Sequence, residues 1–164
     1  MEMGKKYPLK RHEALVKFSQ EHHNGLLLCW KIRQGIKHKI QPDRISAYTL
    51  FFFEEDLKKH FKEEEETLFP RLDPSGPLRL QAIGEHQQIY SLIERIRNEM
   101  AGHDELNEFA DALDKHIRFE ERILFNHIQA RLQDAELTEL ANSHEHSACD
   151  IDARWNDPFW NKYQ

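Results

Sequence analysis

The feature that most constrains this chain is an internal repeat. A shift of 56 residues aligns residues 53–72 with residues 109–128, and 8 of the 20 aligned positions are identical. Each copy contains a histidine with a glutamate four residues later: His60 and Glu64 in the first copy, His116 and Glu120 in the second. The repeat predicts two helices that were built on one pattern and carry the same polar pair.

The histidine and the glutamate of each copy fall on an apolar helical face. A helix turns about 100° per residue, so positions −7, −3, 0, +4 and +8 around each histidine form one stripe. An ionised carboxylate inside a helical bundle costs several kcal/mol unless it meets a counter-charge or a cation, and neither stripe contains lysine or arginine. We therefore predict a buried metal site, because imidazole and carboxylate together suit iron, manganese or zinc. The stripes consist of Phe53, Leu57, His60, Glu64 and Leu68, and of Phe109, Leu113, His116, Glu120 and Leu124.

Two further histidines lie on apolar faces of other expected helices. His22 is at the centre of the face that Phe18 and Leu26 share, and His86 falls on the stripe of Tyr90. His23 is rotated by about 100° from His22, so we expect it at the surface or around the ligands, with replacement of His22 as the alternative. Tyr90 is expected to pack near His86 or to hydrogen-bond a ligand from outside. A single histidine on an apolar face is more often a core residue than a ligand, so these two depend on the repeated pair.

The remaining pattern predicts an all-α protein, an antiparallel four-helix bundle with a short C-terminal helix and tail. Helices are expected at about residues 11–34, 45–69, 78–100 and 104–131, with a fifth at 134–144. Short connections force neighbouring helices to run in opposite directions. We expect a single domain over residues 1–164, with the bundle core at about 10–132 and the C-terminal helix and an aromatic strap at 133–164.

Composition excludes several classes of protein. The net charge of −6 counts against a nucleic-acid partner, and no apolar run approaches the roughly 20 residues of a membrane span. Residues 1–11 lack the apolar stretch of a signal peptide, and Cys29 and Cys149 form no disulfide framework, so we expect a cytoplasmic protein. The group His144, His146, Cys149 and Asp150 fits no standard zinc spacing.

These motifs resemble the hemerythrin-like domains, also called HHE cation-binding domains. The likeness covers about residues 10–132, and its most specific segments begin at His60 and His116; the pairs Glu21-His22 and Glu85-His86 are similar to the family's first and third helix signatures. The resemblance implies a hemerythrin-like bundle with two iron ions, although zinc or manganese also suits the donors. It implies the ligand set His22, His60, Glu64, His86, His116 and Glu120, with both glutamates bridging the ions.

One departure from the oxygen carriers of the family bears on function. They have a second histidine one turn after the third-helix histidine, where this chain has Tyr90. The ligand set is closer to iron-sensing and bacterial stand-alone members. The leading hypothesis is a di-iron protein that binds or senses oxygen, nitric oxide or iron itself, with no membrane and no nucleic-acid partner, while its protein partner is left open.

Two alternatives stay open at this point. The same centre could act as an enzyme or iron donor, in peroxide or nitric oxide reduction, ferrous oxidation or iron–sulfur repair, although no general acid, nucleophile or phosphate loop favours catalysis. It could also be a structural metal in a helical interaction module, with the tail at residues 155–160 and the basic stretch Lys31, Arg33, Lys37 and Lys39 as partner surfaces.

We expect Glu63→Ala and Glu121→Ala to leave metal occupancy near normal, because the assumed helical phase turns both side chains away from the site.

Overall fold

The structure, a computed structural model, describes residues 10–98, 101–143 and 150–163. These residues form helices and connecting turns, with no strand among them. The all-α prediction is confirmed. The α-helices are α1 (Glu13–Lys37), α2 (Pro42–Phe52), α3 (Lys58–Glu63), α4 (Pro77–Asn98), α5 (His103–Phe119), α6 (Phe125–Arg131) and α7 (Asp134–Ser143).

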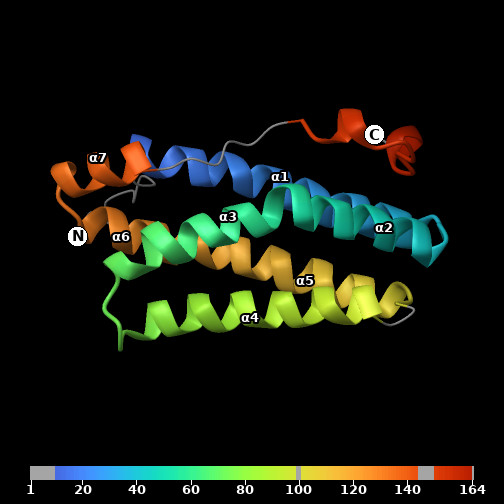
Figure 1. Cartoon of the computed structure of the whole chain (residues 1–164), viewed down its shortest axis with the longest axis horizontal. Coiled ribbons are helices and arrows are strands. Elements are labelled where there is room, and N and C mark those ends of the chain that lie inside the picture. The colour runs from blue at the N-terminus through green and yellow to red at the C-terminus, as the bar shows by residue number, and fades with distance from the viewer. Residues whose placement is uncertain (1–9, 99–100, 144–149, 164) are drawn as a thin grey trace, which may run out of the picture.

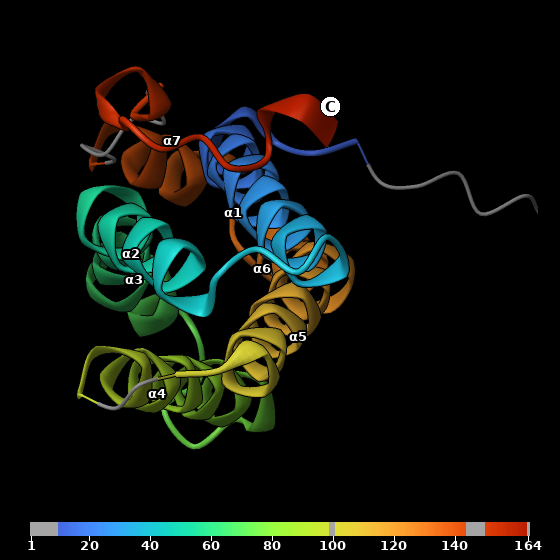
Figure 2. The same ribbon diagram turned by 90° about the vertical axis from the view of Figure 1, so that its right-hand side faces the viewer.

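Four long helical rods make the bundle, and each rod packs against the next with the chain direction reversed (Figure 1). The first rod is α1 and the third is α4. The second joins α2 to α3, and the fourth joins α5 to α6, because helical turns of another type bridge each pair. The end view shows the four rods around one interior, with α7 and the C-terminal segment outside them (Figure 2).

The bridging turns are π-helical, and two of them begin at the repeated glutamates. They span Glu64–Leu68 and Glu120–Leu124, which are 56 residues apart and so match the sequence repeat. A third, Phe53–Leu57, joins α2 to α3. Single π-helical turns inside helices are rare and occur frequently at functional sites. The expected rods are thus present, but their α-helical phase is interrupted directly after each glutamate.

The apolar core is divided into two clusters along the bundle. One cluster contains Leu28, Tyr48 and Phe109, and the other contains Phe18, Phe69 and Phe125 towards the N-terminal end of α1. On each of the four rods, buried histidines or glutamates lie where the two clusters meet. The fold therefore places a polar layer between two dry clusters.

The C-terminal segment packs on the bundle, as its aromatic residues predict. Phe159 and Trp160 are buried in the cluster that contains Tyr48. Lys31 of α1 is also buried there; its Nζ lies 2.5 Å from Asp152 Oδ2 and donates to the Tyr48 hydroxyl at 3.0 Å. No helix in the described ranges is long and apolar enough to cross a membrane.

Candidate metal centre

The polar layer brings together the six predicted ligand side chains. They come from all four rods: one from α1, one from α4, and a histidine with a glutamate from each of the two repeat copies. Their exposed fractions are 3% or less, so bulk water is excluded from the whole group. The six residues are His22, His60, Glu64, His86, His116 and Glu120.

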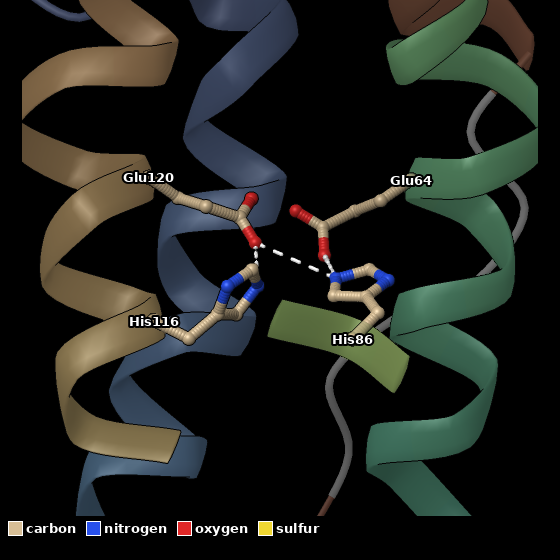
Figure 3. A group of neighbouring side chains, drawn as sticks. All are labelled: Glu64, His86, His116 and Glu120. Atoms are coloured by element: carbon tan, nitrogen blue, oxygen red, sulfur yellow. Dashed lines mark ion pairs between the residues drawn. The ribbon is translucent and has the colours of Figure 1, made fainter. Parts of the chain in front are cut away.

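The donor atoms form two overlapping groups, in each of which the atoms lie within 4.8 Å of one another. The first group is His22, His60 and Glu64, and the second is Glu64, His86, His116 and Glu120. Figure 3 shows the second group, whose carboxylates project from opposite rods towards the imidazoles of α4 and α5. Glu64 belongs to both groups, so its carboxylate stands between the two halves of the site.

Short contacts connect the carboxylates to the imidazole Nε2 atoms. Glu64 Oε1 lies 3.1 Å from His60 Nε2 and 3.3 Å from His86 Nε2. Glu120 Oε1 lies 3.7 Å from His86 Nε2 and contacts His116 Nε2 directly. His22 Nε2 is 3.9 Å from Glu64 Oε2 and 3.8 Å from Glu120 Oε2. Both glutamates thus face histidines of both halves.

The inward atoms are buried without hydrogen bonds. Within the described part of the chain, the Nε2 atoms of the four histidines and both carboxylate oxygens of Glu64 and Glu120 have no hydrogen-bond partner. Buried polar atoms are nearly always satisfied, so a group of orphaned donors and acceptors needs an explanation. Nitrogen and oxygen donors that converge in this way fit a metal site.

The pKa values of the group reflect mutual attraction. Burial alone would lower the pKa of His60, His86 and His116, but neighbouring carboxylates outweigh burial and raise all three pKa values. Burial likewise works to raise the pKa of Glu120, yet the nearby imidazoles, His116 first, hold that pKa well below its usual range. Imidazoles and carboxylates of the group thus favour each other's charged forms. A bound cation would compete with protons for the Nε2 atoms.

A second set of glutamates contacts the outer nitrogen, Nδ1, of each imidazole. Three of the contacts have hydrogen-bond distances and the fourth is an ion pair. An ionised carboxylate can only accept, so the Nδ1 atoms of His22, His60 and His116 donate in the three hydrogen bonds. The pairs are His60 with Glu21 at 2.5 Å, His22 with Glu121 at 2.7 Å, His116 with Glu85 at 2.9 Å and His86 with Glu65 at 3.5 Å.

Comparison with protein-family profiles matches residues 12–128 to the family described as the hemerythrin HHE cation-binding domain. The chain belongs to this family. The recognition made from the sequence is confirmed. Comparison with curated proteins and comparison with solved structures gave no match.

The two residues expected around the ligands have different positions in this HHE domain. The Tyr90 hydroxyl donates to Glu65 Oε2 at 2.9 Å, and Glu65 in turn faces His86 Nδ1, so Tyr90 does belong to the surroundings of the site. His23 is exposed and lines a cleft of about 540 Å³ outside α1. Of the two positions expected for His23, the structure has the surface one, because one residue of helix rotation turns it away from the layer that contains His22.

The structure corrects the expectation for Glu121. Its carboxylate accepts from His22 Nδ1 and from Arg11, so it borders the site and does not point away from it. The signal that could have revealed this is adjacency. Each of the four outer glutamates is the immediate sequence neighbour of a predicted ligand, as in Glu64-Glu65 and Glu120-Glu121.

The basic stretch considered as a partner surface is partly internal. Lys31 is buried under the C-terminal segment, and Arg33 pairs with Asp111 at 2.8 Å and Asp114 at 2.7 Å. Both cations make contacts within the chain, and the buried Lys31 is not available to a partner surface. Of the weak zinc candidate near the C-terminus, residues 144–149 lie outside the described residues.

Proposed function

We propose that this HHE domain is a non-haem di-iron protein that binds or senses a small molecule, oxygen or nitric oxide, or iron itself. The observation that carries the proposal is the buried layer of orphaned Nε2 and carboxylate atoms from all four rods. Bulk water does not reach these atoms at the observed burial, whereas bound metal cations would satisfy them. The family's cation binding supports the same conclusion.

The proposed ligands divide between two ions. His22 and His60 would hold one ion, and His86 and His116 the other, with Glu64 and Glu120 between them. When bound, ferrous iron would supply coordination positions for a diatomic molecule. If iron itself is the signal, occupancy of the site would report its supply. The residues of the chain hold the imidazoles in place and exclude bulk water from the donors.

The surrounding apolar side chains favour a small ligand. Phe61 stacks on His86 with ring centroids 3.9 Å apart, and Phe125 stacks on His22 at 5.1 Å. With apolar clusters on both sides, the layer offers a diatomic molecule a dry environment and gives a large substrate no room.

We place the protein in the cytoplasm on the cysteine usage expected of a reducing compartment.

Anaerobic loading of the purified chain with ferrous iron tests the proposal. We expect two iron ions per chain by elemental analysis, and a change in the absorbance spectrum on addition of oxygen or nitric oxide. Glu66→Ala, on the exposed side of the second rod, is the matched control for Glu64→Ala and should retain the iron. Fewer than one bound ion per chain, unchanged by added ferrous iron, would overturn the proposal.

A further inference from the structure

Each of the four inward histidines is held from behind by its own glutamate. The outer glutamates, Glu21, Glu65, Glu85 and Glu121, contact the Nδ1 atoms, and none of them belongs to the two donor groups of the centre. Nothing in the repeat alone requires such contacts, because each pair joins residues of different rods. The outer glutamates therefore form a set of their own, distinct from the six ligands.

The outer contacts follow the sequence repeat in the same way as the ligands do. Glu21 of α1 reaches His60 on the second rod, as Glu85 of α4 reaches His116 on the fourth rod. In the opposite direction, Glu121 reaches back to α1, as Glu65 reaches to α4. One arrangement of carboxylate and imidazole is thus built four times in the molecule.

A carboxylate at Nδ1 fixes the chemistry of the other ring nitrogen. Because an ionised carboxylate only accepts, it keeps the proton on Nδ1 and leaves the Nε2 lone pair directed into the layer. It also adds negative charge close to the centre without occupying a coordination position. Since six carboxylates then surround the proposed ions, the higher charge of the oxidised state is favoured.

We propose that the outer glutamates are positioning residues that tighten metal binding and lower the reduction potential of the centre. This inference rests on the proposed function. Burial and distance grade the four contributions. The Glu21 side chain is 1% exposed and lies 2.5 Å from its imidazole, whereas Glu65 is 34% exposed and lies 3.5 Å away. Glu21 has the largest effect and Glu65 the smallest, with Glu85 and Glu121 between them.

Glutamine substitution at each position is the test, with Glu66→Gln as the control. Glutamine retains an oxygen that accepts from Nδ1 but removes the charge, and alanine removes both. For Glu21→Gln we expect roughly 10- to 100-fold weaker binding of ferrous iron, measured by competition with a chelator, and a higher midpoint potential by spectroelectrochemistry. Zinc binding, which is insensitive to redox state, measures positioning separately, and Glu21→Ala should weaken it more than Glu21→Gln does.

The outcomes separate this inference from the proposed function. If the unsubstituted chain binds no iron, the proposed function fails and the zinc arm alone decides the positioning role. If it binds iron, but all four glutamine variants match Glu66→Gln in affinity and potential, the inference is wrong while the di-iron centre stands. Far-UV circular dichroism confirms that each variant is folded, and Tyr90→Phe provides a milder change at Glu65. A larger loss at Glu65 than at Glu21 would contradict the proposed grading.

Discussion

The α1–α3 half and the α4–α5 half of the site offer the same donor types in different surroundings. Glu121, which contacts His22 of the first half, also accepts from the Arg11 guanidinium at 3.1 Å. Its counterpart Glu65, which faces His86 of the second half, accepts from the neutral Tyr90 hydroxyl. The inner carboxylates differ as well, since Glu64 faces both donor groups and Glu120 belongs to one. The repeat therefore reproduces the donors and not their environment, and the halves need not bind metal equally.

Removal of the inner carboxylates should give the largest difference between the halves. Glu64→Ala takes a donor from both groups, so we expect loss of both ions, whereas Glu120→Ala should retain one ion beside His22 and His60. Elemental analysis of the iron-loaded variants measures the two stoichiometries, with Glu66→Ala as the control. Equal loss in both variants would show that the halves are equivalent and that the comparison is wrong.

The C-terminal segment should stabilise only the side of the bundle made by α1 and α2. Asp152→Asn leaves the buried Lys31 ammonium without the carboxylate that it contacts. Because the Asp152 side chain is 33% exposed, solvent screening reduces the loss of stability. We expect a loss of about 1–2 kcal/mol in the free energy of unfolding, measured in urea, with metal stoichiometry unchanged. Glu55→Gln, which breaks the exposed pair with Arg154, should change stability by less than about 0.5 kcal/mol. Comparable losses in both variants would refute a special role for Lys31.

Two helical glycines, one in each half, should respond to alanine in opposite directions. A Cβ atom at Gly25 would lie 2.7 Å from Ile117 Cδ1, so Gly25→Ala has to displace that side chain and should destabilise the fold by about 1 kcal/mol. A Cβ at Gly84 meets nothing within 4 Å, and Gly84→Ala should stabilise α4 by about 0.5–1 kcal/mol. Urea unfolding of both variants is the measurement. A stable Gly25→Ala variant would mean that α1 and α5 are less closely packed than the structure has them.

Cys29, on the α1 side, should give the smallest effect. Burial raises the pKa of its thiol to about 12, so almost no reactive thiolate exists near neutral pH. In a Cys149→Ser variant we expect no reaction with Ellman's reagent between pH 7 and 9 until the chain is unfolded in urea. Rapid modification of the folded variant would contradict the packing between α1 and α5.

The fold and the inner donors could be predicted because both follow from helical periodicity. The histidine and glutamate of each copy lie four residues apart, and one turn of helix places them on one face whatever the rest of the chain does. The repeat supplied the second observation that a single His86 or His22 lacks. The bundle followed from long glycine-poor segments with short connections.

The outer contacts could not be predicted, because they depend on which rods become neighbours. Glu121 meets His22 across 99 residues of sequence, and an assumed α-helical phase turned it away from the site. Glu21 and Glu85 make the same kind of contact from ordinary α-helix, so adjacency to a ligand marks a candidate, while the packing of the rods decides which imidazole it meets. The burial of Lys31 could not be predicted for a related reason, because its partner, Asp152, is 121 residues away.

Anomalous diffraction at the iron absorption edge, from crystals of the iron-loaded chain, tests the central claim most directly. We predict two anomalous peaks in the polar layer, one beside His22 and His60 and the other beside His86 and His116, with Glu64 and Glu120 between them. A single peak in the layer, or peaks only at the surface, would contradict the account.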